Sequence, residues 1–434
     1  MDLKTTPRFL VAHPTGNTYV RNDLRALQEA GQLWRFVTAL GTSRDSAWAR
    51  LPGPWHAEIN RRAYDLSGDL IQRVRPAREI MRHVAPRLGW EDLLRHETGW
   101  ACVDAVYHSL DRAAARLIAQ TAGHTNAPNA VLTYEDGAEK TLMAARRAGW
   151  LGVYHLPIAY GPYARQLFAE EAQRLPDWAP TLQGDRDSPA KMDRKLRELE
   201  LADAVVCPSR FVYESLPPSV RQVKPCHIVP YGAPPPPVDP GSDAVRNSLK
   251  RPFRLLFMGA LSQRKGLADL FAAIKILGNP KNLELILMGK VCAPLDFYRD
   301  QGVPFIYEPP RPNEEILDFM AQCDAFVLPS IVEGRAIVQL EALSRGLPLL
   351  VTPNAGGDDL ITPGETGFLV PIRDPAALAE KINWLLEHRA ELPRLRAACR
   401  ARAAACSWEA YRRRLQSILG SGAESISGQI SSNS

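Results

Sequence analysis

Residues 254–277, RLLFMGALSQRKGLADLFAAIKIL, decide the fold that the sequence predicts. Residues 254–258 form a short, continuous and mostly apolar run, which is typical of a strand buried on both faces. Gly259 ends this run, and a polar loop then leads into a helical pattern over 267–277. A buried strand, a glycine-containing loop and a helix together make the repeating unit of parallel α/β sheets.

The same unit recurs on both sides of this stretch. Further strands are expected at 283–288, 325–328 and 348–351, and before them at 9–12, 36–40, 131–134, 153–155, 204–207 and 227–230. Helical segments separate the strands, for example at 20–30, 314–322 and 338–344. The sequence therefore predicts an α/β protein with two open parallel sheets, whose ligands bind beyond the carboxyl ends of the strands.

The segment GAPPPPVDPGSD, residues 232–243, separates the two halves. Four consecutive prolines form a stiff, extended connector and do not belong to a core. We therefore predict an amino-terminal domain over 1–240 and a second domain over 245–405. The Gly/Ser-rich residues 420–434 are expected to be a disordered tail.

Composition excludes several classes of protein. The chain has 434 residues, 45% of them hydrophobic and 23% charged, which is an ordinary globular balance. Its net charge of +5 is too small to indicate nucleic-acid binding, although it leaves contact with an anionic membrane face open. The seven cysteines form no CxxC pair, so zinc ribbons are not expected. With no signal peptide or membrane span recognised, the expected location is the cytoplasm.

Residues 333–341, EGRAIVQLE, carry the strongest functional signal. Glu333 lies in a loop after a strand, and Glu341 lies in the helix that begins between the two acids. If that helix began at Gly334, both carboxylates would share one face of it. The amide-rich start of such a helix is a natural site for a phosphate group.

The loop that follows strand 254–258 carries a second signal. Gly259 allows a tight backbone, and Arg264 and Lys265 can neutralise a diphosphate as it becomes a leaving group. Each signal also has an explanation that involves no ligand. Glutamates at this spacing occur on ordinary helices, and exposed cations are commonly solvated. The combination at two neighbouring strand ends favours a ligand site.

Taken together, these motifs resemble the retaining glycosyltransferases of the B fold (GT-B), family 4 in the usual classification. The resemblance includes further motifs, at 201–206, 229–232, 364–370 and 407–409. It covers about residues 200–415 and is weak before residue 130. It implies two Rossmann-like domains that face a central cleft, with a final helix, 407–419, that packs back on the first domain.

The resemblance also implies roles for individual residues. Glu333 would bind the hydroxyls of the donor sugar, and Glu341 the ribose of the nucleotide. Arg264 and Lys265 would bind the diphosphate. The remaining donor-site positions in this interpretation are Gly259, Gly334, Arg335, Ala336 and Ile337. Arg335 and Ala336 depart from the family pattern, which has an aromatic residue and a glycine there, and Arg335 would add a cation near the phosphate.

Three positions of the first domain are candidates for the acceptor side. Gly16 and Asn17 lie in a loop that half matches the glycine-rich loop of the family. Asp136 ends a predicted strand and would face the same cleft. The resemblance also makes His155, at another strand end, a catalytic candidate beside the reacting sugar.

The predicted activity is transfer of a sugar, with retention, from a nucleoside diphosphate sugar to a saccharide or lipid-linked acceptor hydroxyl. We expect no cofactor and no metal, because no DxD pair lies at a strand end; Asp358 and Asp359 are adjacent. The alternatives are a nucleotide-sugar epimerase, a phosphorylase, or a binding protein whose catalytic site has decayed.

Two regions of the first half have less certain roles. Four tryptophans, Trp48, Trp55, Trp90 and Trp100, are expected in the core, with an acceptor pocket as the alternative. The charged helix over 191–200, KMDRKLRELE, is interpreted as a solvated face.

Overall fold

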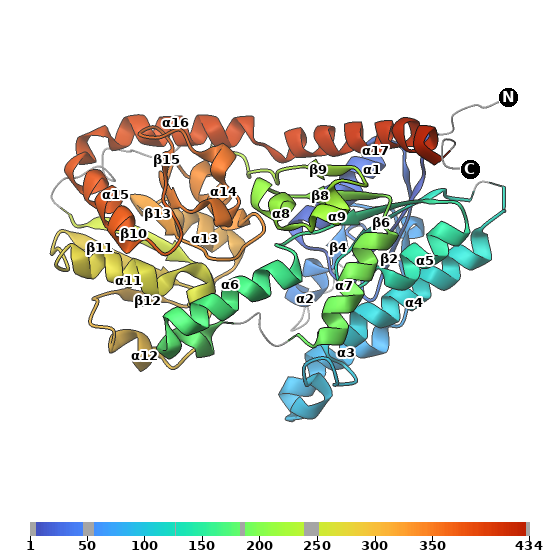
Figure 1. Ribbon diagram of the computed structural model, residues 1–434, viewed down its shortest axis with the longest axis horizontal. Helices are drawn as coiled ribbons and strands as arrows, with labels where there is room; N and C mark the ends of the chain where they lie inside the picture. Colours follow the sequence, from blue (N-terminus) through green and yellow to red (C-terminus); the bar gives the residue numbers. More distant parts are fainter. Residues whose placement is uncertain (1–5, 47–55, 126, 183–186, 238–250, 431–434) are drawn as a thin grey trace.

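The computed structural model describes residues 6–46, 56–125, 127–182, 187–237 and 251–430. The chain forms two α/β domains that lie side by side, each built around one main parallel sheet (Figure 1). The fold class predicted from the apolar runs is confirmed. The predicted domain boundary at 240–245 lies outside the described residues.

The first domain has a seven-stranded sheet in the order β5-β2-β1-β6-β7-β8-β9 within the described residues. Its strands are β1 (Phe9–Ala12), β2 (Leu33–Thr38), β5 (Ile71–Arg73), β6 (Ala130–Tyr134), β7 (Leu151–His155), β8 (Ala204–Cys207) and β9 (Cys226–Ile228). Every pairing in it is parallel. A short pair, β3 (Thr42–Ser43) and β4 (Ala63–Tyr64), lies apart from it.

Helices of the first domain connect these strands. They are α1 (Thr18–Glu29), α2 (His56–Arg61), α3 (Pro76–Val84), α4 (Val103–Thr121), α5 (Glu139–Arg147), α6 (Gly161–Arg174), α7 (Pro189–Leu201), α8 (Arg210–Ser215) and α9 (Pro218–Arg221). Short 3-10 turns follow α3 and α6, among them η5 (Pro176–Thr181).

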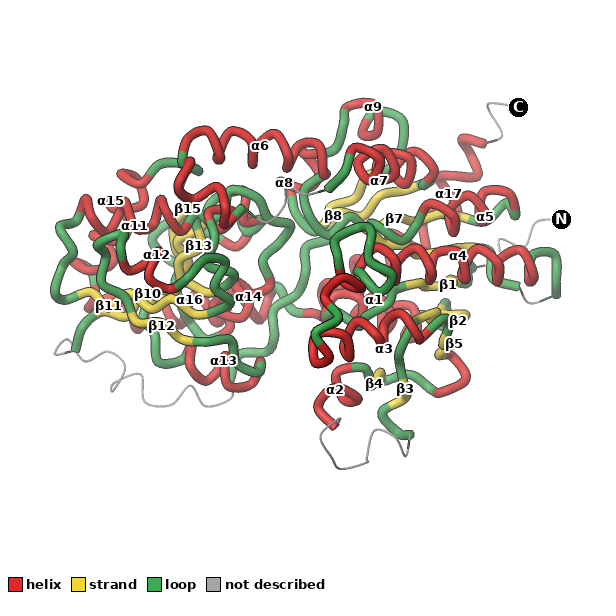
Figure 2. The backbone as a smooth tube through the Cα atoms, turned by 90° about the horizontal axis from the view of Figure 1, so that it is seen from below, coloured by secondary structure: helices red, strands yellow, loops and turns green. Residues whose placement is uncertain are grey.

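The second domain has a six-stranded sheet in the order β12-β11-β10-β13-β14-β15, again with parallel pairs throughout. Its strands are β10 (Phe253–Met258), β11 (Leu283–Met288), β12 (Ile306–Glu308), β13 (Ala325–Leu328), β14 (Leu349–Val351) and β15 (Gly367–Leu369). Its helices are α11 (Leu267–Ile276), α12 (Leu295–Arg299), α13 (Asn313–Met320), α14 (Ile337–Ser344), α15 (Pro375–Glu387) and α16 (Leu392–Ala405). Figure 2 shows helices on both sides of each yellow sheet.

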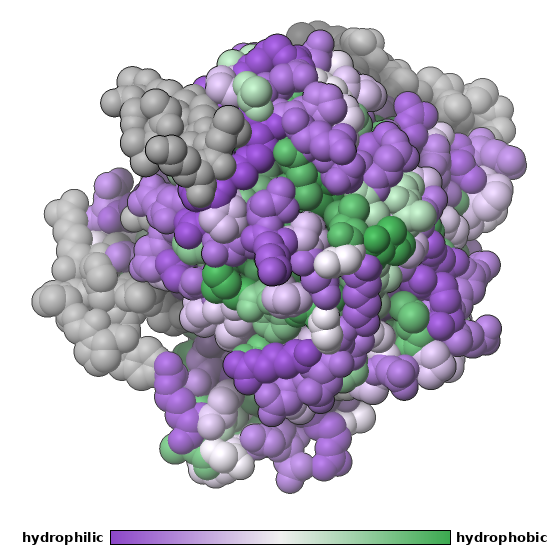
Figure 3. All heavy atoms as spheres, turned by 90° about the vertical axis from the view of Figure 1, so that its left-hand side faces the viewer, coloured by the Kyte–Doolittle hydropathy of each residue, from purple (hydrophilic) through white to green (hydrophobic). Residues whose placement is uncertain are grey.

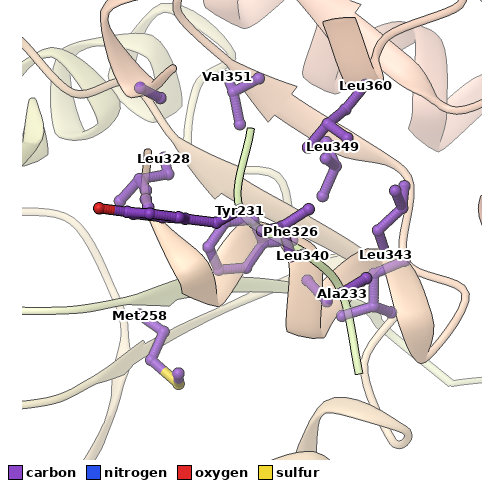
Figure 4. Close-up of a cluster of buried hydrophobic side chains, with 14 of the residues drawn as sticks. Tyr231, Ala233, Met258, Phe326, Leu328, Leu340, Leu343, Leu349, Val351 and Leu360 are labelled. Atoms are coloured by element: carbon purple, nitrogen blue, oxygen red, sulfur yellow. The ribbon is translucent and has the colours of Figure 1, made fainter. Parts of the chain in front are cut away.

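The chain crosses between the domains twice, after β9 and again near Ser407. These two crossings lie next to each other. Ala233, after β9, forms a parallel bridge with Ser407, and its amide donates to the carbonyl of Cys406 at 2.7 Å. Tyr231 and Ala233 also belong to the apolar cluster that contains Phe326 and Leu340 of the second domain (Figure 4). The two crossings therefore share one packed hinge.

The final helix, α17 (Trp408–Ile430), returns to the first domain and packs on α1. Tyr411 donates to Asp23 from its buried hydroxyl, and Gln416 donates to the carbonyl of Ala26 at 2.9 Å. In Figure 1, α16 and α17 lie end to end along the top of both domains. The helix continues past residue 419, where the sequence prediction ended it, and residues 431–434 lie outside the described part.

A segment of the first domain, residues 161–181 (α6 and η5), lies against the second domain, and we call it the strap. Trp178 of the strap is buried between Phe297 and Phe271, with ring centroids 4.9 and 5.9 Å away. In Figure 1 the green helix α6 extends beneath the second domain. The predicted boundary at residue 240 therefore assigns to the first domain a segment whose side chains also pack on the second domain.

Two interpretations of the first half were wrong. Trp90 and Trp100 are 50% and 46% exposed, so neither belongs to the core, while Trp48 and Trp55 lie outside the described residues. The charged helix α7 is not a solvated face, since Lys191, Lys195 and Glu198 are buried. A charge-rich pattern alone did not reveal that opposite charges from other segments neutralise this helix.

The face of the molecule seen in Figure 3 is mostly hydrophilic, with apolar residues near its centre. Among the described residues, no helix is long and apolar enough to cross a membrane.

The hinge gives a first testable prediction. A Cβ at position 232 would lie 2.4 Å from backbone atoms of Trp408, so Gly232→Ala forces the two crossings apart. We expect a loss of about 2 kcal/mol in the free energy of unfolding, measured by urea denaturation. Gly68→Ala is the matched control, because nothing lies within 4 Å of its added Cβ. Equal stability of both variants would contradict the packed hinge.

Candidate functional site

The loop after β10 is held in a tight conformation by its two glycines. Gly259 has φ 147° and Gly266 has φ 72°, both in the region that favours glycine. A Cβ at position 266 would lie 1.9 Å from the carbonyl oxygen of Pro329, which follows β13. This close approach places Arg264 and Lys265 beside the loop that carries Glu333.

Glu333 contacts both cations of that loop. Its Oε1 lies 3.1 Å from Arg264 Nη2, and its Oε2 pairs with the ammonium of Lys265. Burial lowers the pKa of Lys265 to about 7, and Arg264 acts in the same direction. The Glu333 carboxylate is the negative charge that pairs with this ammonium. Two cations and one acid thus meet at the carboxyl ends of β10 and β13.

Helix α14 begins at Ile337, not at Gly334, so the premise that both acids share one helical face was wrong. Glu333 lies in the preceding loop, and only Glu341 lies within the helix. Glu341 accepts a hydrogen bond from Asn313 Nδ2 at 2.7 Å, and burial raises its pKa. Asn313 begins α13, beyond the carboxyl end of β12.

Two expected phosphate contacts are used for other purposes. The guanidinium of Arg335 is buried, donates to the carbonyl of Gly356 at 2.9 Å, and pairs with Asp359 at 2.5 Å. The amide of Ala336 donates to the carbonyl of Ala355 at 3.2 Å. Arg335 therefore fastens two loops together rather than adding a cation at the site, and the Ala336 amide is already paired. The amide of Ile337 opens the first turn of α14, where helix amides have no partner within the helix.

The Glu333 loop also contacts the first domain. A Cβ at position 334 would lie 1.8 Å from the carbonyl oxygen of Pro157, and the carbonyl of Gly334 accepts from Ser209 Oγ at 2.7 Å. Ile331 and Val332 pack in an apolar cluster with residues of the strap and its surroundings. The Glu333 loop is therefore positioned by both domains.

His155 lies at the end of β7, in a fully buried polar network. Its Nδ1 is 3.2 Å from Asp23 Oδ2, and its Nε2 is 3.1 Å from the hydroxyl of Tyr231. Asp23 also accepts from the hydroxyl of Tyr134 at 2.7 Å. The predicted catalytic histidine thus connects α1 to the hinge, and its side chain has no exposed surface.

The acceptor-side candidates do not come together as one group. Asp136 lies in the turn that follows β6, and its carboxylate pairs with Arg194 at 2.8 Å. Gly16 packs against the ring of Tyr64, where a Cβ would lie 2.5 Å from it. Asn17 precedes α1 and is exposed, with its amide 3.3 Å from the Tyr19 hydroxyl.

One group of side chains within the described residues has a geometry suited to a metal ion: His96, Glu97 and Asp187. The Lys191 ammonium lies 3.0 Å from Asp187 Oδ1 and already neutralises that carboxylate. The three residues belong to the first domain and are not part of the donor-side loops.

Comparison with known proteins identifies the second domain. Residues 242–405 match the family model described as "Glycosyl transferases group 1". The second domain is therefore similar to the glycosyl transferases of group 1. The match covers less than half of the chain and leaves the first domain outside it.

Curated relatives of the chain are glycosyltransferases. The amylovoran biosynthesis glycosyltransferase AmsK of Erwinia amylovora is 29% identical over 36% of this chain and 42% of its own. A D-inositol 3-phosphate glycosyltransferase of Paenarthrobacter aurescens is 29% identical over 38% of this chain and 45% of its own. The chain thus matches less than half the length of these relatives.

Solved structures share the architecture over almost the whole chain. Sucrose-phosphate synthase of Thermosynechococcus elongatus superposes with a TM-score of 0.59 at 20% identity, over 95% of this chain and 98% of that one. HepE of Anabaena, solved with UDP, gives 0.58 at 15% identity over 96% and 100%. The chain therefore has the GT-B fold.

Sequence reasoning missed three residues that contact the predicted site residues: Asn313, Asp359 and Asp23. Asn313 follows a strand that was not predicted, so its place beside Glu341 had no signal. Asp359 was considered only as half of a metal motif, whereas it partners Arg335. Asp23 lies within a helix, 132 positions from His155, and no local pattern connects the two.

The Arg335 contact gives a second prediction. Asp359→Asn leaves a fully buried guanidinium without its charged partner, which we expect to lower the free energy of unfolding by about 2 kcal/mol. Asp358→Asn is the control, because Asp358 lies 3.5 Å from an Arg210 side chain that is 68% exposed. It should cost less than about 1 kcal/mol. Chemical denaturation of both variants measures the difference, and equal losses would contradict this assignment.

Proposed function

We propose that this protein is a retaining glycosyltransferase of family 4 that uses a nucleoside diphosphate sugar. The observation that carries the proposal is the meeting of Arg264, Lys265 and Glu333 at the ends of β10 and β13. A diphosphate fits beside two cations, and the hydroxyls of a sugar fit a carboxylate. The family model and the curated glycosyltransferases support the same activity.

In the proposed reaction, the bond between the anomeric carbon and the diphosphate oxygen breaks while the acceptor oxygen bonds to the same carbon. The acceptor proton passes to the leaving phosphate on the same face, so no protein nucleophile is required. Arg264 and Lys265 stabilise the charge that develops on the diphosphate. Glu333 holds the hydroxyls of the sugar, with Gly334 packed against the first domain.

The nucleotide would extend from the diphosphate toward α14. Glu341, held by Asn313, is the proposed partner of the ribose hydroxyls. The first turn of α14 at Ile337 supplies amides toward the phosphate. HepE is described in complex with UDP-glucose, which supports a nucleotide-sugar donor of this kind.

The proposed acceptor is a saccharide or lipid-linked hydroxyl, used in the synthesis of a polysaccharide or glycoconjugate. AmsK is named for amylovoran biosynthesis, which supports this class. We propose that the protein works in the cytoplasm and contacts the inner membrane face peripherally when its acceptor is carried on a lipid.

A donor panel tests the activity directly. We expect one of the UDP-, GDP-, ADP- or TDP-sugars to be hydrolysed slowly without acceptor, measured as nucleotide release. Lys265→Met should lower turnover roughly 100-fold, because a charged contact to the leaving group is lost. Lys281→Met, at an exposed position of the same domain, should retain activity.

The other outcomes of the panel separate the alternatives. Conversion of the donor sugar with its nucleotide still attached would indicate an epimerase. Activity that depends on inorganic phosphate would indicate a phosphorylase. An absence of both turnover and nucleotide binding in calorimetry would indicate a decayed site and refute the proposal.

We further propose that the reaction requires no metal, since the two cations themselves neutralise the diphosphate. Donor hydrolysis should therefore persist after treatment with excess EDTA and gel filtration. Restoration of a lost activity by Mg²⁺ or Mn²⁺ would overturn this part of the mechanism. The nucleotide-release assay serves as the measurement.

A further inference from the structure

The backbone of the diphosphate loop is bonded to the first domain. The amide of Gln263, directly before Arg264, donates to Thr181 Oγ1 of the strap at 2.9 Å. Thr181 is fully buried, and its hydroxyl in turn donates to the carbonyl of Trp178 at 2.7 Å. Trp178 itself is packed between aromatic rings of the second domain. The packing of Trp178 thus anchors the strap on the second domain, next to the loop to which Thr181 is hydrogen-bonded.

The side chain of Gln263 has a partner for every polar group. Its Nε2 donates to Glu171 of the strap and to Asp269 of α11, at 2.8 Å each. Its Oε1 accepts from the amide of Ala268 at 2.9 Å. Gln263 and Glu171 are fully buried, so these bonds are shielded from water. Gln263 is therefore fixed in one orientation by groups from both domains.

Two arginines neutralise the carboxylates of Glu171 and Asp269, the two acids that accept from Gln263. Arg174 Nη2 lies 2.8 Å from both Glu171 and Asp269, and Arg373 donates to Glu171 from the second domain. Burial acts to raise the pKa of Glu171, but hydrogen bonds from Arg174 and Gln263 outweigh it and lower the pKa. Glu171 is thus held ionised, as a stronger acceptor for the amide of Gln263.

The strap also supports the second donor-side loop. Leu167 and Phe168 of α6 share an apolar cluster with Ile331 and Val332, directly before Glu333. The amides of these two residues donate to the carbonyl of Arg264, at 2.9 and 3.3 Å. One segment of the first domain therefore contacts both loops that bring Arg264, Lys265 and Glu333 together.

We propose that the strap is a positioning element for the donor: Glu171 and Thr181 hold the diphosphate loop in its binding conformation through Gln263. Nucleotide affinity in the second domain then depends on two side chains of the first domain that touch no ligand. This inference rests on the proposed function and names the part of the first domain that completes the donor site. It also gives a physical route by which the relative placement of the domains alters donor binding.

Isosteric variants test the proposal in the full-length protein. Thr181→Val removes the hydroxyl acceptor and keeps the shape, while Glu171→Gln removes the charge. We expect each to raise the dissociation constant for UDP about tenfold, because one buried hydrogen bond to the loop is lost or weakened. Calorimetry measures this with UDP, or with ADP or GDP if the donor panel selects another base.

Matched variants separate positioning from general stability. Thr181→Ser retains the hydroxyl and should rescue most of the affinity lost in Thr181→Val. Glu170→Gln removes the neighbouring ion pair between Glu170 and Arg373. The Glu170 side chain is 41% exposed and is not a partner of Gln263. It should leave UDP affinity within about twofold. The melting temperature of each variant is measured alongside.

Each outcome decides between the two proposals. Loss of UDP affinity in Thr181→Val and Glu171→Gln, with Thr181→Ser and Glu170→Gln near wild type, supports the strap. Wild-type affinity in Thr181→Val and Glu171→Gln, with Lys265→Met defective, overturns the strap and leaves the donor site intact. Equal losses in Glu170→Gln, or losses that only follow the melting temperature, also overturn it. Wild-type affinity in Lys265→Met refutes the donor site itself.

Discussion

The rest of the structure depends on one buried contact between the domains, in which Gln263 of the second domain donates to Glu171 of the first. A buried carboxylate is costly unless it is paired and hydrogen-bonded. Arg174, Arg373 and Gln263 together meet that requirement, and they come from both sides of the interface. Separating the domains at this point would leave the carboxylate with fewer partners, so the contact constrains their relative placement.

This constraint explains where the charged loops lie. Gly266 and Gly334 allow the backbone to approach carbonyl oxygens so closely that no side chain fits. The first approach joins the loop of Arg264 and Lys265 to the end of β13, and the second joins the Glu333 loop to Pro157 of the first domain. Between these two contacts, Arg264, Lys265 and Glu333 have little freedom to move apart. A site of this kind needs little reorganisation when charge develops on a ligand.

The hinge is connected to a buried polar network of the first domain. Asp23 accepts from Tyr134 and Tyr411 and lies beside His155, which in turn meets Tyr231 next to the first crossing. α1, β7, α17 and the crossing after β9 are thus joined through a few buried polar groups. Such a network is favourable only when every member is satisfied, which fixes the hinge segments relative to the first sheet.

The sequence by itself determined the class of fold, because continuous apolar runs specify strands buried on both faces. The runs at 9–12, 325–328 and 348–351 coincide with β1, β13 and β14 or extend them by one residue. Gly259 after a strand end marked the loop with Arg264, and the spaced acids Glu333 and Glu341 marked the other loop. These are local signals, read from residues that are close together in the chain.

Only the tertiary structure decided which charges are paired with distant partners within the protein. Arg335 meets Asp359, Lys191 meets Asp104, and Gln263 meets Glu171, each across at least 24 positions of sequence. A local pattern specifies burial and backbone pairing, but the partner of a buried charge comes from whichever distant segment packs against it. For the same reason the sequence placed residues 161–181 in the first domain, while their side chains complete the second.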